Sequence, residues 1–356
     1  MENINFYNLI LTLSVLLFGT FFYKFFLFLS KKKKSNFLID DQFKKPQAFH
    51  KAPTAIVGGV GIFFSLLIVH YYFFFFKDIL FFKYLSFGIL FFFLGFADDL
   101  KININPKIRL ALMIIFLIIL ITNNDFYIQK TGIEILNIWI QNSDLFSLIF
   151  VIISFLFIIN GANLVDGYNG LLGIHSLIIL ANLFIINYLN GNTDLALFLL
   201  FNILIIINFL IFNFPKGKIF LGDGGAYLLG VIIAISVIKT SIVNSSISPL
   251  YFCILLFYLF FEVFFSFLRK LLKEKTSPIR PDEKHLHMLL YKMLYNKNNN
   301  ILKSNYSVSV IINLIYTILI IPAILMKDNG MFCKYYSLFF FIIYLFSYKI
   351  IRDKYK

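Results

Sequence analysis

Charged residues are scarce in this chain of 356 residues. Asp, Glu, Lys and Arg together make up 14% of it, whereas a soluble protein carries about 25%. There are only two cysteines, and both Cys253 and Cys333 lie in apolar runs, so they carry no information about the redox compartment. Apolar runs of about 18 or more residues recur along the whole length, and the mean hydropathy is +0.85. The composition therefore excludes a soluble globular protein and predicts an integral membrane protein.

The apolar runs predict about eleven membrane-spanning helices. We expect them at residues 7–29, 56–76, 79–96, 109–122, 145–161, 171–189, 193–213, 225–238, 249–268, 306–326 and 331–348. The expected fold class is an all-α polytopic membrane protein with one domain over residues 1–356, since the sequence shows no repeat and no separate soluble domain. The first run does not fit a signal peptide, because its basic cluster follows it.

Acidic residues are fewer than basic ones, with 18 Asp and Glu against 32 Lys and Arg and a net charge of +14. Four lysines at 31–34 follow the first span, so the positive-inside rule places that end in the cytoplasm and the N-terminus outside, in the periplasm. Alternation along the chain then assigns 26 of the 32 Lys and Arg to the cytoplasm and six to the outside. The charge thus reflects topology in a cytoplasmic (inner) membrane, with the C-terminus inside, and predicts no nucleic-acid partner.

Two connections between the predicted spans are long. Residues 123–144, on the outside, alternate apolar with polar around Trp139 and predict either a short hairpin or an interfacial helix. Residues 269–305, on the inside, form the longest polar stretch and hold two of the five histidines. Of the two connections, the inner one carries the histidines and most of the charge.

The segment GFADDL places Asp98 and Asp99 side by side where the third span reaches the cytoplasm. Two adjacent carboxylates at a membrane interface repel each other and need a cation or basic neighbours to stay ionised. The pair therefore predicts a Mg²⁺ or phosphate site in which one acid ligates metal or accepts a proton. The alternative is a solvated pair that caps the span, with Lys101 as its partner.

The segment NGANLVDGYNGLLG, residues 160–173, follows the fifth span. Asn160, Asn163 and Asp166 are spaced i, i+3, i+6 and share a face if this turn is helical. The glycines let the backbone approach a ligand, and the N-terminus of the next helix favours an anion. The alternative is an ordinary polar, glycine-rich connection between two helices.

The segment IFLGDGGAYLLG, residues 219–230, holds Asp223 between Gly222 and Gly224, just before the eighth span. An aspartate in this position can ligate a metal ion while backbone N–H groups face phosphate oxygens. The alternative is an aspartate that caps the helix in a tight turn.

The segment SPIRPDEKHLHMLLYK, residues 277–292, carries His285, His287, Arg280 and Lys284. Histidines spaced i, i+2 do not share a helix face, and no cysteine accompanies them, so a zinc site is not expected. A loop with these cationic and N–H groups suits a diphosphate. The alternative is a basic loop that faces lipid headgroups.

Two further positions are polar in apolar surroundings. Glu262 lies within the ninth span, seven residues before Arg269 and on the same helix face, so it is either functional or part of a buried structural ion pair. His50 and Lys51, in HKAPTAIVGG, either bind a phosphate or mark the plain start of the second span.

The positions of these motifs relative to the membrane favour function over the alternatives. The topology was assigned from Lys and Arg alone, yet all five motif segments emerge at the cytoplasmic face. One shared site explains this better than five unrelated span ends. Acids that bind Mg²⁺ and basic groups that bind phosphate oxygens suit a reaction between a soluble anion and a lipid anion.

GFADDL, NLVDGYNG, FLGDGG and PDEKHLH, in this order and topology, resemble the polyprenyl-phosphate N-acetylhexosamine-1-phosphate transferases of glycosyltransferase family 4. The likeness covers residues 50–292. The form SPIRPDEKHLH looks like the branch that uses UDP-N-acetylglucosamine to start O-antigen, enterobacterial common antigen or teichoic acid synthesis. It is less similar to the peptidoglycan branch, phospho-N-acetylmuramoyl-pentapeptide transferase, which is the alternative.

The resemblance implies roles for individual residues. Asp223, with Asp99, matches the site of Mg²⁺ (or Mn²⁺), and Asp98 matches the residue proposed to activate the lipid phosphate. We expect catalytic roles for Asp98, Asp99 and Asp166. The residues expected to bind substrate are Asn163, Asn169, His285, His287, Arg280, Lys284, His50, Lys51 and Glu262.

The implied reaction is attack of the undecaprenyl phosphate oxygen on the sugar-bearing phosphorus of a UDP-N-acetylhexosamine, with release of UMP. A covalent aspartyl intermediate is the alternative. The sequence departs from the family at Asn169, where a second Asp is usual, at Met288, which replaces a third His, at Ile102, which replaces a Lys, and at Glu262, where Asp is usual. The oligomeric state stays open, a homodimer included.

A membrane transporter or flippase is the rival from another functional class. It predicts acids near the middle of several spans, and only Glu262 comes close to that position. The motif acids lie instead at span ends, which favours the transferase.

Overall fold

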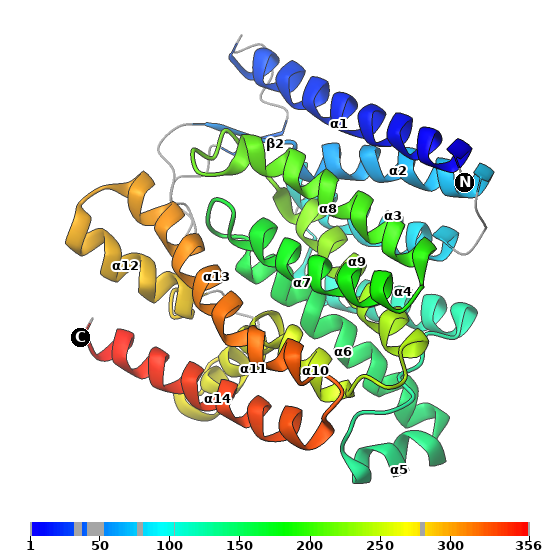
Figure 1. The fold of residues 1–356 in the computed structure, drawn as a ribbon. Coiled ribbons are helices and arrows are strands. Elements are labelled where there is room, and N and C mark those ends of the chain that lie inside the picture. Colours follow the sequence, from blue (N-terminus) through cyan, green and yellow to red (C-terminus); the bar gives the residue numbers. More distant parts are fainter. Residues whose placement is uncertain are drawn as a thin grey trace.

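The computed structural model describes residues 2–31, 38–40, 53–76, 81–102, 104–277 and 282–354. Helices pack side by side across the molecule, with α1 and α14 at opposite edges (Figure 1). The helices are α1 (Glu2–Lys31), α2 (Gly58–Phe76), α3 (Phe82–Asp99), α4 (Pro106–Asn124), α5 (Glu134–Asn142), α6 (Asp144–Val165), α7 (Leu171–Leu189), α8 (Thr193–Asn213), α9 (Gly222–Val243), α10 (Pro249–Leu255), α11 (Phe257–Leu268), α12 (Leu286–Asn298), α13 (Ile301–Leu325) and α14 (Gly330–Asp353), and a π-helical turn, η2 (Arg269–Glu274), follows α11.

The class of fold is as predicted, a polytopic membrane protein built of helices. Within the described residues, nine helices are long and apolar enough to cross a membrane, and a tenth span forms if α10 and α11 with η2 are counted together across their 74° bend. The remaining predicted span overlaps α3, whose 18 residues include Lys83, Asp98 and Asp99. Each of the eleven predicted spans therefore coincides with a helix or with this bent pair.

The helix α9 lies at the centre of the core and is apolar around its whole circumference, as expected for a helix enclosed by others. Glycines allow its neighbours to approach closely. A Cβ atom on Gly59 of α2 would lie 2.5 Å from Gly225 Cα, and one on Gly95 of α3 would lie 2.5 Å from Asp223 O. These contacts fix the start of α9 against the ends of α2 and α3.

A small sheet, which the sequence did not predict, lies at the start of α2 and α9. It consists of β1 (Ile39–Asp40), β2 (Thr54–Ile56) and β3 (Ile219–Phe220). β2 pairs antiparallel with β1 and parallel with β3. Because β3 ends two residues before α9 begins, the sheet ties that helix start to the segment before α2.

The connection at residues 123–144 contains a helix and not a hairpin. Residues 134–142 form α5, and the Trp139 side chain on it is exposed. Its ring meets Phe146 of α6 edge to face, with ring centroids 5.4 Å apart. The segment is therefore a short surface helix packed on α6.

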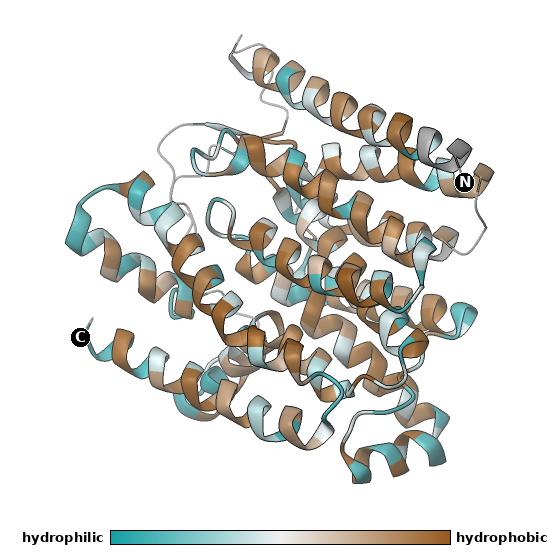
Figure 2. Cartoon of the chain, viewed as in Figure 1, coloured by the Kyte–Doolittle hydropathy of each residue, from teal (hydrophilic) through white to brown (hydrophobic). Residues whose placement is uncertain are grey.

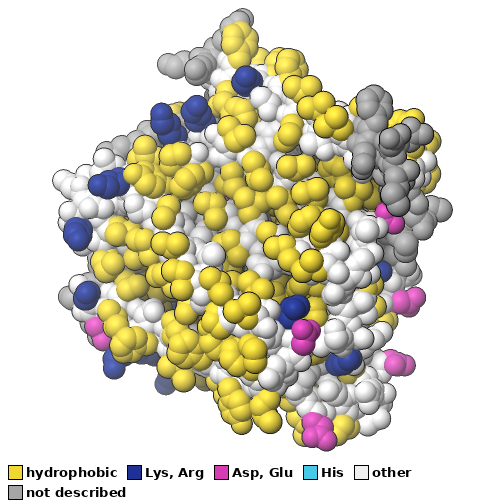
Figure 3. Space-filling view, viewed as in Figure 1, with side chains coloured by type: hydrophobic (Ala, Val, Ile, Leu, Met, Phe, Trp, Pro, Cys, Tyr) yellow, Lys and Arg dark blue, Asp and Glu magenta, His cyan; other side chains and the backbone are white. Residues whose placement is uncertain are grey.

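Polarity is distributed as a membrane protein requires. Hydrophobic residues run along the helices, and hydrophilic ones gather at helix ends and connections (Figure 2). On the visible surface, Lys and Arg gather along the edge where α12 and the C-terminus lie, and most exposed acids lie elsewhere (Figure 3). This edge corresponds to the side that the basic residues predicted to be cytoplasmic.

Candidate functional site

The start of α9 holds the carboxylate of Asp99. The backbone N–H of Asp223 donates to Asp99 Oδ1 at 2.8 Å, and that of Gly224 donates to Asp99 Oδ2 at 3.0 Å. Gly222 has φ +81°, and a Cβ atom on it would lie 2.7 Å from Asp99 Oδ2, so glycine is required there. The backbone N–H groups that we expected to face phosphate oxygens at this helix start bind the Asp99 carboxylate instead.

Asp223 and Asp166 complete a cluster of acids from three helices. Asn163 Nδ2, on α6, donates to Asp223 Oδ1 at 2.8 Å. Asp166 caps the C-terminal end of α6. Desolvation, and then the negative charges of Asp223 and Asp99, raise the pKa of Asp166 well above its usual range. The structure therefore brings Asp99, Asn163, Asp166 and Asp223 together, and we call these four residues the acid centre.

Asp98 points to a different partner from its neighbour. It forms an ion pair with Arg109, in the first turn of α4. Lys101 was the partner considered in the alternative of a solvated pair, and Arg109 was not considered as a partner. The short turn between α3 and α4 brings this arginine back to the aspartate pair. Arg109 thus places a fixed cation at the edge of the acid centre.

The loop from Asp166 to Gly170 carries the predicted contact Asn169, which is buried. Its Nδ2 donates to the carbonyl of Pro215 at 2.9 Å, and its backbone N–H donates to Asn305 Oδ1 at 2.9 Å. A Cβ atom on Gly217 would lie 2.7 Å from this side chain. Asn169 is therefore packed between α13 and the turn before β3, and its side chain contributes to holding the loop in place.

Tyr168, in the same loop, connects the acid centre to the histidine motif. Its ring lies 5.8 Å from the His287 ring in an edge-on arrangement and 5.4 Å from the Tyr291 ring. Sequence reasoning did not single out Tyr168, because an aromatic residue in a glycine-rich loop gives no signal of its partner. Through Tyr168, the NLVDGYNG motif lies beside the PDEKHLH motif.

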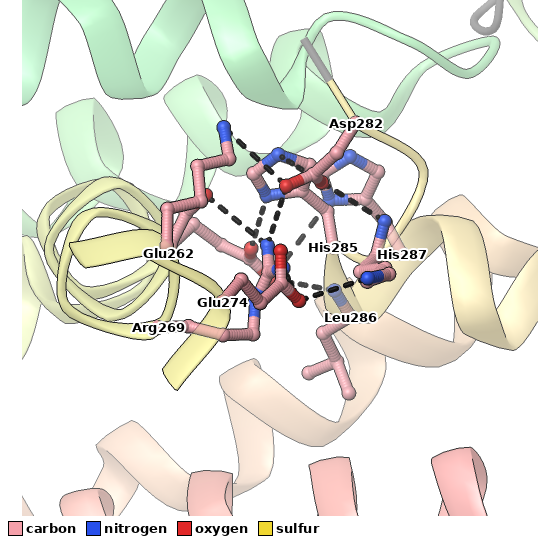
Figure 4. A network of polar contacts seen from close by, with 10 residues as sticks. Glu262, Arg269, Glu274, Asp282, His285, Leu286 and His287 are labelled. Carbon is pink, nitrogen blue, oxygen red and sulfur yellow. Dashed lines mark hydrogen bonds and ion pairs between the residues drawn. The ribbon is translucent and has the colours of Figure 1, made fainter. Parts of the chain in front are cut away.

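Glu262 anchors the two histidines (Figure 4). His285 Nδ1 lies 3.2 Å from Glu262 Oε2, and the backbone N–H of Leu286 donates to Oε1 at 3.2 Å. His287 Nδ1 lies 3.9 Å from the same carboxylate and 3.3 Å from the hydroxyl of Tyr258. Glu262 is 1% exposed and His287 is fully buried. The buried structural pair that was the alternative for Glu262 is thus formed with the histidines.

The two histidines stack, although residues at i, i+2 do not share a helix face. His285 precedes the first turn of α12 in an extended conformation, so its ring can lie parallel to that of His287 at 5.5 Å. Burial, the largest influence, lowers the pKa of His287 to about 4, despite the nearby Glu262 charge. His287 is therefore neutral at pH 7.

Arg269 follows Glu262 by seven residues at the end of α11, as expected, and its N–H still donates to the Phe265 carbonyl in the helical pattern, but its side chain finds partners other than Glu262. Arg269 instead reaches Glu274 and Asp282, each at 2.8 Å. Lys284 Nζ pairs with Glu274 at 2.9 Å. Burial alone would raise the pKa of Asp282, but the Lys284 N–H, Arg269 and His285 outweigh it and hold the pKa at about 2. We call Glu262, Arg269, Glu274, Asp282, Lys284, His285 and His287 the histidine network.

Three predicted substrate contacts, His50, Lys51 and Arg280, lie outside the described residues. Among the residues that are described, no three His, Cys, Asp or Glu side chains stand close enough together to form a ready metal site. The oxygen donors of the acid centre nevertheless fit Mg²⁺, which is usually held by one or two carboxylates together with water and phosphate oxygens.

Comparisons with known proteins identify the family of this chain. The model of glycosyl transferase family 4 matches residues 81–241, which include the acid centre. An undecaprenyl-phosphate alpha-N-acetylglucosaminyl 1-phosphate transferase of Thermotoga maritima is 32% identical over 255 residues, 72% of this chain and 73% of that protein. The protein of the same name from Escherichia coli K12 is 26% identical over 291 residues, 79% of this chain and 75% of that protein.

A phospho-N-acetylmuramoyl-pentapeptide-transferase of Dictyoglomus turgidum is 33% identical over 208 residues, 55% of this chain and 61% of that protein. The match to the Thermotoga protein is longer and covers most of both chains. The resemblance seen in the four motifs is confirmed, and the chain belongs to glycosyl transferase family 4.

Proposed function

We propose that this chain transfers N-acetylglucosamine 1-phosphate, or a related N-acetylhexosamine 1-phosphate, from a UDP-sugar to undecaprenyl phosphate. UMP is the other product, and the lipid-linked sugar starts a cell-surface polysaccharide. The observation that carries the proposal is the acid centre, in which Asp99, Asp166 and Asp223 converge from three helices. Neighbouring carboxylates that raise the pKa of Asp166 favour a cation beside them, and a cation suits a diphosphate substrate.

The cation that we propose is Mg²⁺, or Mn²⁺ in its place. Asp223, whose carboxylate Asn163 orients, would hold it, with Asp99 alongside at the start of α9. When bound, the ion would neutralise charge on the diphosphate as the leaving group departs. Because both Asp99 oxygens already accept backbone N–H groups, we assign Asp223 the larger share of the binding.

In the proposed reaction, an oxygen of the lipid phosphate forms a new bond to the sugar-bearing phosphorus. The bond from that phosphorus to the bridging oxygen breaks, and this oxygen leaves with UMP. A phosphate monoester dianion is a competent nucleophile near neutral pH, so a single in-line displacement suffices. Asp98, held by Arg109, lies beside the acid centre, where it would orient the lipid phosphate or accept its proton. A covalent aspartyl intermediate is the alternative.

We further propose that the acid centre faces the cytoplasm of a cell with this chain in its inner membrane. The edge rich in Lys and Arg supports this orientation, because the positive-inside rule applies to it (Figure 3). The soluble UDP-sugar would then reach the site from the compartment in which nucleotide sugars are made. The proposed homodimer stays a prediction.

One observation favours a second candidate, transfer of phospho-N-acetylmuramoyl-pentapeptide for peptidoglycan. The Dictyoglomus relative named for that activity is 33% identical over 208 residues. The two candidates differ in the donor, so a panel of UDP-sugars separates them.

The test is release of UMP by purified protein with Mg²⁺, undecaprenyl phosphate and UDP-N-acetylglucosamine. We expect Asp223→Asn to lower the rate by about a thousandfold or more, since removing a preorganised charge at such a centre costs several kcal/mol. Asp125→Asn is the matched control, because Asp125 is exposed at the far end of α4 and in a left-handed conformation that asparagine tolerates. If folded wild-type protein releases no UMP from any UDP-sugar in the panel, the proposal fails.

A further inference from the structure

The loop from Asp166 to Gly170 is held by side chains from two distant helices. Asn305 Oδ1 of α13 accepts the N–H of Asn169 at 2.9 Å, and Asn213 Oδ1 of α8 accepts the N–H of Gly170 at 2.7 Å. Because a backbone N–H can only donate, the amide oxygen is the acceptor in both bonds. The position of this loop therefore depends on α8 and on α13.

The face of α13 that meets this loop is polar, although the helix is apolar enough to span a membrane. Asn305, Ser309 and Asn313 are buried and follow one another at i, i+4, i+8, which places them on one face. Asn313 Nδ2 donates to the carbonyl of Leu171 at 3.2 Å, and Asn313 Oδ1 lies 3.1 Å from His175 Nδ1. Polar groups buried in a membrane helix are costly, so a stripe of them indicates a specific task.

The loop brings Asp166 to the acid centre, three residues before Asn169. Near Asn169 the loop also carries Tyr168, which contacts the histidine network. Helix α13 lies beyond residues 81–241, the range of the family model, and none of the four motifs falls on it. Its contact with the loop is therefore a link between the C-terminal helices and the reaction centre that no motif accounts for.

We propose that Asn305 is a positioning residue for the reaction. It holds the loop through the Asn169 N–H, and thereby sets the distance from the loop to Asp223 and to the nucleotide. The inference rests on the proposed function for its effect on rate. Its structural part, the restraint of the loop by Asn305, does not depend on the substrate.

The test compares three variants of purified protein. Asn305→Leu keeps the size of the side chain and suits a membrane helix, but it leaves a buried N–H without an acceptor. We expect kcat/KM for the UDP-sugar to fall about tenfold, mainly through KM, with KM for undecaprenyl phosphate within about twofold of wild type. Asn305→Asp keeps an acceptor oxygen for the Asn169 N–H, so it should restore most of the kcat/KM lost in Asn305→Leu.

Asn300→Ala is the matched control on the same helix. Asn300 caps α13 by accepting the N–H of Lys303 at 2.9 Å, so its loss weakens the helix start without touching the loop. We expect wild-type kcat/KM from this control. A merely structural role for Asn305 predicts similar losses in the Asn300→Ala and Asn305→Leu variants and no rescue by aspartate.

Hydrogen exchange of the peptide containing residues 166–171 gives a readout independent of activity. We expect faster exchange in Asn305→Leu and wild-type exchange in Asn305→Asp and Asn300→Ala. Wild-type exchange and wild-type kcat/KM in folded Asn305→Leu would overturn the inference. If that variant does not fold, Asn305→Ala is measured in its place by the same criteria. Absence of UMP release from the wild type would instead count against the proposed function. The hydrogen-exchange result alone would then test whether Asn305 restrains the loop.

Discussion

The acid centre and the histidine network are neighbours that differ in how their charges are balanced. In the acid centre, Asp99, Asp166 and Asp223 are half-buried carboxylates close enough to raise one another's proton affinity. In the histidine network, Glu262 is almost fully buried, but two histidines and a backbone N–H surround it. In the first region neighbouring carboxylates repel one another, whereas in the second a single buried carboxylate is surrounded by hydrogen-bonding groups.

This difference indicates different tasks for the two regions. A group of like charges at a solvent-accessible point is stable only with a cation or a proton, so the acid centre is suited to bind and release ions. The buried histidine network holds α11, η2 and the start of α12 in one arrangement. Tyr168 joins the two regions, since its ring contacts His287 while its loop carries Asp166.

The largest effect on the histidine network should come from Glu262→Leu. The change leaves the Leu286 N–H and the His285 ring without their acceptor in a buried place, which costs about 2–4 kcal/mol. We expect a lower thermal unfolding midpoint together with slower UMP release, because the loop before α12 loses its anchor. Glu262→Gln keeps one acceptor oxygen and should lose less stability.

Glu134→Leu, on the exposed face of α5, serves as the control for loss of a glutamate. If Glu262→Leu is as stable as this control, the network does not anchor the loop, and the contrast between the two regions disappears.

The pH dependence of stability should have opposite signs in the two regions. The pKa of Asp166 is raised in the folded protein, so its contribution to stability is present below the ordinary pKa and is lost as pH rises. The pKa of Asp282 is lowered from 3.8 to about 2, so its contribution is present above 3.8 and is lost as pH falls toward 2.

Thermal unfolding of metal-free protein between pH 2 and pH 8 checks both signs. Asp166→Asn should raise the midpoint near pH 7 by about 2 °C relative to wild type, and added Mg²⁺ should shrink this difference. Asp282→Asn should lower the midpoint at pH 5 and converge with wild type near pH 2. Shifts of the same sign in both variants at neutral pH would contradict the comparison.

The smallest effect should come from Lys284→Ala. Lys284 pairs with Glu274 at 2.9 Å, but its side chain is 57% exposed, and exposed ion pairs contribute about 1 kcal/mol or less. Its predicted role at a diphosphate is tested by the same variant. Wild-type stability with a raised KM for the UDP-sugar would support that role. A wild-type KM would mean that Lys284 only pairs with Glu274 at the exposed side of the network and does not bind the substrate.

The sequence predicted much of the acid centre, because topology could be read from charge. The placement of Lys and Arg put the ends of α3 and α6 and the start of α9 at one face, and the structure brings their Asp99, Asn163 and Asp223 into contact. The helical class also followed from hydropathy, whereas alternation in residues 123–144 left a hairpin and a surface helix open, and the structure has the helix α5. These features depend on local composition or on simple alternation across a membrane.

The rest depended on contacts between residues far apart in sequence. Asn169 meets Asn305 across 136 positions, and a side-chain amide gives no signal of which backbone group it will bind. The partners of Arg269, which are Glu274 and Asp282, depended on η2, and no proline or glycine marks the change from α-helix to π-turn there. Neither the two-residue strands nor the ion pair of Arg109 with Asp98 could be read from hydropathy.

The central claim is that the acid centre is a cation site through Asp223. It is tested most directly by titrating metal-free protein with Mn²⁺ in the presence of UDP-N-acetylglucosamine and counting bound ions by electron paramagnetic resonance. We expect wild type and Asp125→Asn to bind Mn²⁺ alike and Asp223→Asn to bind at least about tenfold more weakly. Equal affinity in folded Asp223→Asn would contradict the account.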